Sequence, residues 1–312
     1  MKKTALVTGG AGFVGSNIAN RLMKEGWIVD IVDDLSNGHL EFVRDSLKES
    51  SGSRFIQGDF VHPTVLDSIK DKRYDVIFHE AAVPRVAYSV ENPSETTDTN
   101  ISKTVRLMEA ARGNVRRVVF ASSSSVYGGA DNLPTLESEP KTPVSPYALQ
   151  KLVVEDYAKL FNKLYGLDMV CLRYFNVFGP NQFGDSPYST AVSAWCHAVK
   201  EGVPLRSDGD GEQTRDLCYI DNVVDANLIV ANYEGCFAGD AFNVACGDRT
   251  SNNEILEFFK KRFEGISIEH APERAGDVKH TQADISAISK LGYEPKVKFW
   301  EGLEKTIGWW KI

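Results

Sequence analysis

The first half of the sequence predicts an α/β fold with a doubly wound parallel sheet. Short runs rich in β-branched residues occur at 4–8, 28–33, 54–59, 75–82 and 116–123. Amphipathic stretches at 14–24 and 94–111 separate some of these runs, as in strand–helix–strand units around a parallel sheet. Right-handed crossovers place the helices of such units on both faces of the sheet. From residue 175 onward the chain departs from this strict alternation.

Length and charge exclude several classes of protein. The 312 residues can bury a large core and suggest one large domain or two unequal ones. The net charge of −8, without a long basic run, disfavours nucleic acid and anionic membranes as partners. No apolar run reaches the roughly 18 residues that a membrane span needs, and the six histidines show no metal-ligand spacing. We expect neither a membrane segment nor a metal site.

The cysteines and the N-terminus favour a cytoplasmic protein. The five cysteines are odd in number and form no CxxC pair, which is typical of reduced thiols that pack in a core. The start "MKKTALV" is similar to the basic end of a signal peptide, but Thr8, Gly9 and Gly10 interrupt the apolar run before a hydrophobic region forms. We expect no signal peptide and a cytoplasmic location.

The turn after the first predicted strand has the pattern of a phosphate-binding loop. In "TGGAGFVGS", Gly9, Gly12 and Gly15 follow a strand and open a helix. Such glycines allow a tight turn and a close approach of the backbone to a pyrophosphate, which the free N–H groups of the helix then bind. Asp33 ends the second strand, where a carboxylate accepts hydrogen bonds from an adenosine ribose. Its charge repels a 2′-phosphate, so we expect NAD; Asp34 adds to this repulsion or is only a turn residue.

The stretch "SPYALQKL" (145–152) predicts the start of a helix with two polar side chains on one face. Ser145 suits the cap, and Pro146 suits the first helical position. Tyr147 and Lys151 are four residues apart, so their side chains lie about one turn apart. Tyrosine has a pKa near 10, and a neighbouring ammonium lowers it by stabilising the phenolate. The pair is either a solvated surface pair or a catalytic base with its activating cation.

Further motifs follow the Gly-rich turn in order along the chain. They are "GDF" (58–60), "FHEAAVPRV" (78–86), "DTNISKTVRLMEAA" (98–111), "SSSSVYG" (122–128), "SPYALQK" (145–151) and "LRYFNVFGP" (172–180). Together they resemble the NAD-dependent epimerase/dehydratase family of extended short-chain dehydrogenase/reductases. The resemblance implies a Rossmann-type NAD-binding domain over 1–175, joined again by 217–248. It implies a smaller α/β domain for a nucleotide sugar over 176–216 and 249–312.

The same resemblance implies the contacts to NAD. Lys151 would hydrogen-bond the nicotinamide ribose, and Phe175 would pack near the nicotinamide. The implied cofactor-binding residues are Gly9, Gly12, Phe13, Val14, Asp33, Asn37, Gly38, Asp59, Phe60, Ala81, Ala82, Asn100, Ser122, Tyr147, Lys151 and Phe175.

The catalytic residues that the resemblance implies are Tyr147, Lys151, Ser123 and Ser124. Tyr147 would take a proton from a sugar hydroxyl while NAD takes a hydride from the same carbon, with Lys151 stabilising the phenolate. Ser123 would hydrogen-bond the reacting oxygen, unless it is only a buried residue at a strand end. Ser124 can share this role, because the register within four serines is open.

The serine run also bears on the type of reaction. Dehydrating relatives carry Asp and Glu in the two positions before "VYG", and decarboxylating relatives usually carry Glu directly before it. Here these positions are Ser124 and Ser125, and neither hydroxyl is a ready proton donor to a leaving group. The resemblance therefore implies a UDP-hexose 4-epimerase that regenerates NAD in each turnover. The alternatives are a 4,6-dehydratase, a UDP-glucuronate decarboxylase and a non-enzymatic NAD-sensing regulator.

The second half carries the implied substrate contacts. Arg215 and Arg274 would clamp the diphosphate, or each would only pair with a neighbouring carboxylate, Asp216 or Asp277. Asn176 would contact the sugar–phosphate region, and Asp277 would bind the nucleotide ribose. The implied substrate-binding residues are Pro84, Ser123, Ser125, Asn176, Ala191, Val192, Arg215, Arg274, Asp277 and Thr281.

Thr281 bears on which sugar binds. Relatives restricted to glucose carry a tyrosine seven residues after the arginine matched by Arg274, where this chain has Thr281. A small residue leaves room for a 2-N-acetyl group, unless Thr281 is a loop residue that lines nothing. We therefore expect interconversion of UDP-GlcNAc and UDP-GalNAc, and of UDP-Glc and UDP-Gal, with uracil or thymine in the nucleotide left open. The resemblance also implies a homodimer through the helix that begins at "SPYALQK" and the helix over 94–111.

Overall fold

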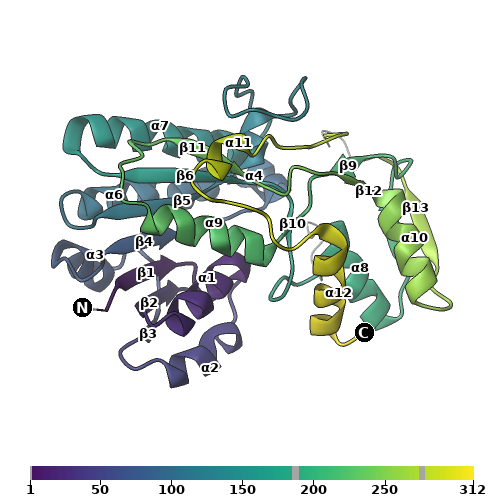
Figure 1. Cartoon of the computed structure of the whole chain (residues 1–312), viewed down its shortest axis with the longest axis horizontal. Coiled ribbons are helices and arrows are strands. Elements are labelled where there is room, and N and C mark those ends of the chain that lie inside the picture. Colours follow the sequence, from purple (N-terminus) through teal and green to yellow (C-terminus); the bar gives the residue numbers. More distant parts are fainter. Residues whose placement is uncertain (1, 185–189, 274–277) are drawn as a thin grey trace.

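The computed structural model describes residues 2–184, 190–273 and 278–312, and its largest element is a seven-stranded parallel sheet (Figure 1). The strand order is β11-β6-β5-β4-β1-β2-β3. The strands are β1 (Thr4–Thr8), β2 (Ile28–Asp33), β3 (Arg54–Gln57), β4 (Val76–His79), β5 (Arg117–Ser123), β6 (Met169–Tyr174) and β11 (Ala241–Val244). The predicted doubly wound α/β fold is confirmed, because parallel strands with non-consecutive neighbours need crossovers.

Helices cover both faces of this sheet (Figure 1). One face carries α1 (Phe13–Lys24) and α9 (Ile220–Asn232), with α2 (Glu41–Glu49) beside α1. The other carries α3 (Pro63–Lys70), α6 (Thr104–Ala111) and α7 (Pro146–Tyr165). A separate apolar cluster lies under each layer, so the sheet is buried on both sides. The return of the chain through α9 and β11 adds a helix against α1 and an edge strand beside β6.

The connection from β4 to β5 is less regular than the sequence suggests. It contains α4 (Val86–Glu91), α5 (Pro93–Thr97), a π-helical segment (Asp98–Lys103) and α6. The prediction of one regular helix over 94–111 was therefore wrong in its middle. There the Asn100 side chain is buried and accepts a hydrogen bond from the Val83 N–H at 2.8 Å. Such π-helical turns occur mainly where a helix serves a functional site.

A smaller group of elements lies beside the carboxyl edge of the sheet (Figure 1). It contains α8 (Ala191–Glu201), α10 (Asn252–Arg262), α12 (Phe299–Trp310) and the parallel pair β8 (Leu205–Asp208) and β13 (Ile268–Ala271). Two short strand pairs lie between this group and the sheet: β7 (Val177–Phe178) pairs with β10 (Cys218–Tyr219), and β9 (Thr214–Arg215) pairs with β12 (Thr250–Ser251). The short helix α11 (Ser286–Ser289) comes later in the chain, before α12.

The described residues also bear on the expectations about thiols, metals and membranes. All five cysteines are free, and four of them are buried: Cys171, Cys196, Cys218 and Cys246. Within the described residues, no group of three or more His, Cys, Asp or Glu side chains could hold a metal ion. No helix in the described part of the chain has the length and apolar character that a membrane span requires.

Candidate active site

A cleft of about 1760 Å³ runs along the carboxyl ends of the central strands. Its wall includes the Gly-rich turn after β1, the ends of β2, β4, β5 and β6, and the start of α7. The carboxyl edge of an open parallel sheet is the usual place for a ligand, since the loops there splay apart where the strand order reverses. In this sheet the order reverses between β1 and β4.

The Gly-rich turn forms a cradle that side chains would fill. A Cβ on Gly15 would lie 2.2 Å from the carbonyl oxygen of Gly9, and a Cβ on Gly9 would lie 2.7 Å from the Ala81 nitrogen. Gly9 also has a φ of 63°, a conformation that favours glycine. Gly12 caps α1 without any side-chain hydrogen bond, so the first N–H groups of the helix are available to an anion. The turn therefore fits a pyrophosphate, as the sequence predicts.

Asp33 lies at the carboxyl end of β2 and lines the cleft. Its carboxylate accepts hydrogen bonds from the N–H groups of Ala11 at 2.9 Å and Leu35 at 2.8 Å. A Cβ on Gly38 would lie 2.6 Å from this carboxylate, so the loop after β2 closes tightly around Asp33. Burial raises the pKa of Asp33, and the two backbone donors counter that rise. Acceptor capacity remains on the side that lines the cleft.

The predicted catalytic pair stands on the first turns of α7. Ser145 caps the helix by accepting the Ala148 N–H at 3.2 Å, with Pro146 at the first helical position, so the predicted helix start is confirmed. Tyr147 and Lys151 are 9 % and 3 % exposed and both line the cleft, which contradicts a solvated surface pair. The Lys151 ammonium donates to the Ala121 carbonyl at 2.6 Å and lies 5.7 Å from the centre of the Tyr147 ring.

Burial sets the electrostatics of this pair. It raises the pKa of Tyr147 to about 12, while a hydrogen bond with the Ser123 side chain lowers it and the Glu80 charge raises it. It lowers the pKa of Lys151 to about 8, against the attraction of Glu80. The phenol is thus protonated at neutral pH in the protein alone. A cationic ring bound beside Tyr147 would stabilise the phenolate and make it a usable base.

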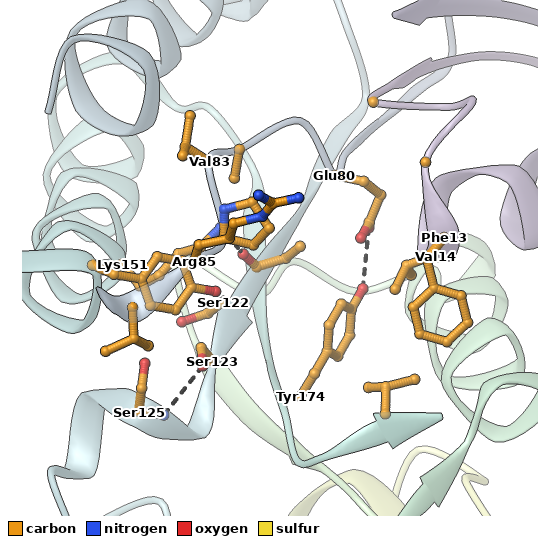
Figure 2. A pocket seen from close by; sticks show the side chains of 18 of the residues that line it. Phe13, Val14, Glu80, Val83, Arg85, Ser122, Ser123, Ser125, Lys151 and Tyr174 are labelled. Carbon is orange, nitrogen blue, oxygen red and sulfur yellow. Dashed lines mark hydrogen bonds between the residues drawn. The ribbon is translucent and has the colours of Figure 1, made fainter. Parts of the chain in front are cut away.

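The run of four serines spans the end of β5 and the turn after it, and Ser122, Ser123 and Ser125 differ in their partners (Figure 2). Ser122 donates to the buried Glu155 carboxylate at 2.5 Å. Ser123 accepts the Ser125 N–H at 3.2 Å and so caps the short 3-10 turn Ser124–Tyr127. The Ser125 hydroxyl is buried and has no hydrogen-bond partner among the described residues. All four line the cleft, and an orphan hydroxyl there fits a polar ligand.

Thr281 lies in the cleft wall near Asn176 and Asp216. Its hydroxyl oxygen accepts hydrogen bonds from the Asn176 side chain at 3.1 Å and from the Asp216 N–H at 3.2 Å. The Asp216 carboxylate in turn accepts the N–H groups of Cys246, Gly247 and Ala283. Thr281 lines the cleft, so the alternative of a loop residue that lines nothing is wrong. Its hydroxyl also fastens two segments of the cleft wall together.

Most of the predicted site residues line this one cleft. Those that do are Gly9, Gly12, Phe13, Val14, Asp33, Asn37, Gly38, Asp59, Phe60, Ala81, Ala82, Pro84, Ser122, Ser123, Ser124, Ser125, Tyr147, Lys151, Phe175, Asn176, Arg215 and Thr281. Asn100 does not; it accepts the Val83 N–H and donates to Gln150 at 2.7 Å, so it positions the loop after β4. Ala191 and Val192 begin α8 away from the lining, with Val192 fully buried in the core. Arg274 and Asp277 lie outside the described residues.

The polar side chains of the cleft that sequence reasoning missed include Glu80, Arg85 and Tyr174. Glu80 and Arg85 lie in the quoted motif "FHEAAVPRV", and Tyr174 lies in "LRYFNVFGP". Arg85 donates to the Asn37 side chain at 2.8 Å and so connects the loops after β4 and β2. The Tyr174 hydroxyl donates to the Glu80 carboxylate at 3.1 Å (Figure 2). The sequence did contain a signal for two of them, because Glu80 and Arg85 are charged residues directly after a run that reads as a buried strand.

Comparisons with known proteins show the family of the chain. The profile of the NAD dependent epimerase/dehydratase family matches residues 5–245. The chain is 37 % identical over 308 residues to the UDP-glucose 4-epimerase of Mycolicibacterium smegmatis, covering 97 % of this chain and 96 % of that protein.

Two solved structures extend the similarity over the whole fold. One is a UDP-N-acetylglucosamine 4-epimerase from Methanobrevibacter ruminantium in complex with UDP-N-acetylmuramic acid, at 37 % identity and a TM-score of 0.93, with 100 % of this chain and 99 % of that chain covered. The other is the UDP-glucuronic acid 4-epimerase of Bacillus cereus in complex with UDP-glucuronic acid and NAD, at 30 % identity and a TM-score of 0.90, with 99 % of each chain covered.

Proposed function

Because the chain belongs to the NAD-dependent epimerase/dehydratase family, we propose that it is a UDP-N-acetylglucosamine 4-epimerase that also accepts UDP-glucose. The single observation that carries the reaction type is the cleft in which Tyr147 and Lys151 lie beside a serine run that contains no acid. The 4-epimerases among its relatives, on UDP-glucose and on UDP-N-acetylglucosamine, agree with this reading.

The residues of this chain divide the chemistry between them. The Gly-rich turn, Asp33 and Lys151 would hold NAD, which would supply the acceptor and donor for the hydride at C4 of the sugar. Tyr147 accepts the proton of the C4 hydroxyl as the C–H bond breaks and gives it back when the hydride returns. The Lys151 ammonium stabilises the phenolate in between, and the Ser123 hydroxyl hydrogen-bonds the sugar oxygen.

The serine run argues against elimination and decarboxylation. Ser124 and Ser125 occupy the positions where an additional acid and base would be needed, and their hydroxyls cannot protonate a leaving hydroxyl at neutral pH. The serine run therefore offers no acid or base that would carry a 4-keto sugar on to elimination or decarboxylation. Turning the keto sugar over and reducing it on its other face is the reaction that remains.

The preference for an N-acetylated sugar rests on Thr281. This small side chain lines the cleft where a larger ring would occupy the volume of a 2-N-acetyl group. The relative solved with UDP-N-acetylmuramic acid also binds a 2-N-acetylated sugar nucleotide. UDP-glucuronic acid is the competing substrate, because another relative is a 4-epimerase of that sugar.

Product analysis tests the proposal. Purified protein is incubated separately with UDP-GlcNAc, UDP-Glc and UDP-glucuronic acid, and the sugar anomeric signals are followed by NMR. We expect the gluco and galacto forms of UDP-GlcNAc to approach equilibrium, with slower turnover of UDP-Glc. Turnover of UDP-glucuronic acid alone would overturn the assigned substrate. A stable 4-keto product or released CO2 would instead identify a dehydratase or a decarboxylase.

A further inference from the structure

The Glu80 side chain is an acid inside the cleft for which the proposed chemistry has no use. It follows β4 directly and precedes Ala81, whose backbone abuts the Gly-rich turn at Gly9. In Figure 2 its carboxyl group points into the cleft between Tyr174 and the start of α1, where Phe13 and Val14 lie. An acid in this position faces the part of the cleft that holds the cofactor.

The hydrogen bonds of Glu80 orient its carboxylate without satisfying it. The Asn227 amide nitrogen donates to the Tyr174 hydroxyl at 2.8 Å, and the Tyr174 hydroxyl has two acceptors within reach of its own proton, the Glu80 carboxylate at 3.1 Å and the Asn227 amide oxygen at 3.2 Å. A carboxylate has about four acceptor positions. Within the described residues Tyr174 is the side-chain donor that reaches it, so acceptor capacity remains toward the cleft.

The charged groups around Glu80 do not neutralise its carboxylate by a direct ion pair. Lys151 on α7 attracts it, but the Lys151 ammonium donates to the Ala121 carbonyl rather than to this carboxylate. The other titratable groups nearby are the phenols of Tyr147 and Tyr174, whose pKa values burial raises, and His79, whose pKa burial lowers to about 3, so all three are neutral at pH 7. Burial raises the pKa of Glu80 to about 7, while Tyr174 and Lys151 lower it. A positive charge arriving in the cleft would favour the ionised form.

We propose that the Glu80 carboxylate stabilises the oxidised, positively charged nicotinamide of NAD over the reduced, neutral ring. The catalytic pair Tyr147 and Lys151 defines the nicotinamide end of the cleft, and the charge of Glu80 acts on both of these side chains. Opposite charges attract most strongly where water is excluded. Glu80 therefore holds the cofactor in the form that starts each turnover.

This role for Glu80 also compensates for its unfavourable effect on the proposed base, Tyr147. The Glu80 charge raises the pKa of Tyr147, which on its own opposes the formation of the phenolate. The same charge favours the cationic ring, whose presence lowers that pKa again. The inference depends on NAD binding, which characterises the family, and not on which sugar the enzyme epimerises.

A competition experiment measures the preference directly. The full-length protein and the Glu80→Gln variant are incubated above pH 7 with mixtures of NAD and NADH in known ratios. The protein is separated by gel filtration, and the bound cofactor is released and quantified by chromatography. Gln keeps the size of the side chain and can still accept the Tyr174 hydrogen bond. We expect the ratio of bound NAD to bound NADH to fall about tenfold, which equals about 30 mV for a two-electron couple.

Two further variants make the result specific. Asp34→Asn removes an exposed carboxylate at the adenosine end, which both cofactor forms share, and should leave the ratio unchanged. Tyr174→Phe removes the donor to Glu80, so the carboxylate ionises less readily and the ratio should fall by a smaller factor. An unchanged ratio in Glu80→Gln overturns the proposal. If that variant does not fold, an unchanged ratio in Tyr174→Phe overturns it.

Discussion

The Lys151 ammonium lies 5.7 Å from the centre of the Tyr147 ring, and both side chains are buried at the wall of the same cleft. The helix that carries both residues is capped by Ser145, two residues before Tyr147. The cap therefore fixes the position of the Tyr147 backbone at the cleft wall. The Tyr147 N–H also donates to the Ser89 hydroxyl at 3.1 Å, so α4 holds the same turn from the other side. The pair is positioned by backbone contacts that do not involve a ligand.

Replacing Tyr147 by Phe should remove epimerisation and leave the cofactor bound. In the proposed mechanism the phenol hydroxyl moves the proton, and general acid–base catalysis contributes typically 10²–10⁴-fold, so we expect kcat to fall by about that factor. Steady-state NMR assays measure the rate, and chromatography of released cofactor measures the NAD content.

The control for this variant is Tyr157→Phe on the same helix. Tyr157 packs on Phe161 and does not line the cleft, so kcat should change by less than about twofold. A Tyr147→Phe enzyme that retains nearly full kcat would show that another group is the base.

Replacing Lys151 by Met should shift the pH dependence of the reaction upward. In the proposed mechanism the Lys151 ammonium stabilises the phenolate, so we expect its loss to raise the pKa of Tyr147 in the complex. Because the base must be ionised, kcat/KM should then reach its plateau about 1–3 pH units higher. The loss is therefore largest at neutral pH and partly recovered in alkaline solution. Profiles of kcat/KM against pH for both enzymes measure the shift.

Lys103→Met is the matched control for the pH shift. Lys103 also lines the cleft, but it pairs with Asp59 at 2.8 Å. Its loss should leave the midpoint of the profile in place. A Lys151→Met enzyme with reduced activity but an unmoved midpoint would mean that Lys151 only positions the cofactor.

The local patterns were enough to predict the frame of this site. The strands over 4–8 and 28–33, the Gly-rich turn and the start of α7 follow from residue preferences within a few positions, and the structure confirms them. The π-helical segment at 98–103 could not be predicted in this way, because Asn100 is turned inward by the backbone of Val83, 17 residues away. The hydrogen bond between the Val83 N–H and the Asn100 side chain accompanies a local change from α-helical to π-helical backbone, and local residue preferences do not encode such a contact.

The polar partners inside the cleft depend on still longer distances in the sequence. Glu80 meets Tyr174 across 94 residues, and Thr281 meets Asn176 across 105. The sequence alone indicated Thr281 as a small side chain that leaves room for a 2-N-acetyl group. Its second role, as the acceptor that ties the Asn176 segment to Asp216, needs the fold. Spacing within a motif indicates which residue types are present, whereas the topology decides which of them touch.

Breaking the buried ion pair behind the serine run should cost much of the stability. Glu155 on α7 and Arg173 on β6 are fully or almost fully buried. The Arg173 Nη2 and Glu155 Oε2 atoms lie 2.6 Å apart. Glu155→Leu leaves the Arg173 charge unpaired, and such losses amount to about 3–5 kcal/mol of unfolding free energy. Denaturant unfolding followed by circular dichroism measures the loss.

Two variants provide the comparison for this pair. The double variant Glu155→Leu/Arg173→Met removes both charges and should recover part of the loss. Glu301→Gln breaks the exposed pair with Lys305 and should cost less than about 1 kcal/mol. Equal losses in the Glu155 single variant and the Glu301 variant would contradict a buried pair that supports α7.

We also predict that α7 takes part in a homodimer. Leu160 and Leu164 lie one turn apart on this helix and are 46 % and 57 % exposed, an unusual exposure for two large apolar side chains. Replacing both by Glu should convert a dimer into a monomer, which light scattering after gel filtration measures. The pair Leu40 and Val203, exposed on other elements, is the control. A protein that is monomeric without substitution would refute the prediction.

The sugar preference should change when Thr281 becomes bulky. Thr281→Tyr places a ring at the lining of the cleft, and overfilling a packed site costs typically 1–3 kcal/mol. We expect the ratio of kcat/KM for UDP-GlcNAc to that for UDP-Glc to fall by about tenfold or more. Steady-state assays with both sugars give this ratio.

The hydroxyl of Thr281 requires its own control, because Thr281→Tyr also removes the acceptor for Asn176 and for the Asp216 N–H. Thr281→Val removes the same acceptor with little change in volume, so it should slow both sugars by similar factors and keep their ratio within about twofold. If Thr281→Tyr slows both sugars equally, as Thr281→Val does, the residue fastens the cleft wall and does not select the sugar. A loss confined to UDP-GlcNAc in Thr281→Tyr alone identifies the volume of the side chain as the selective feature.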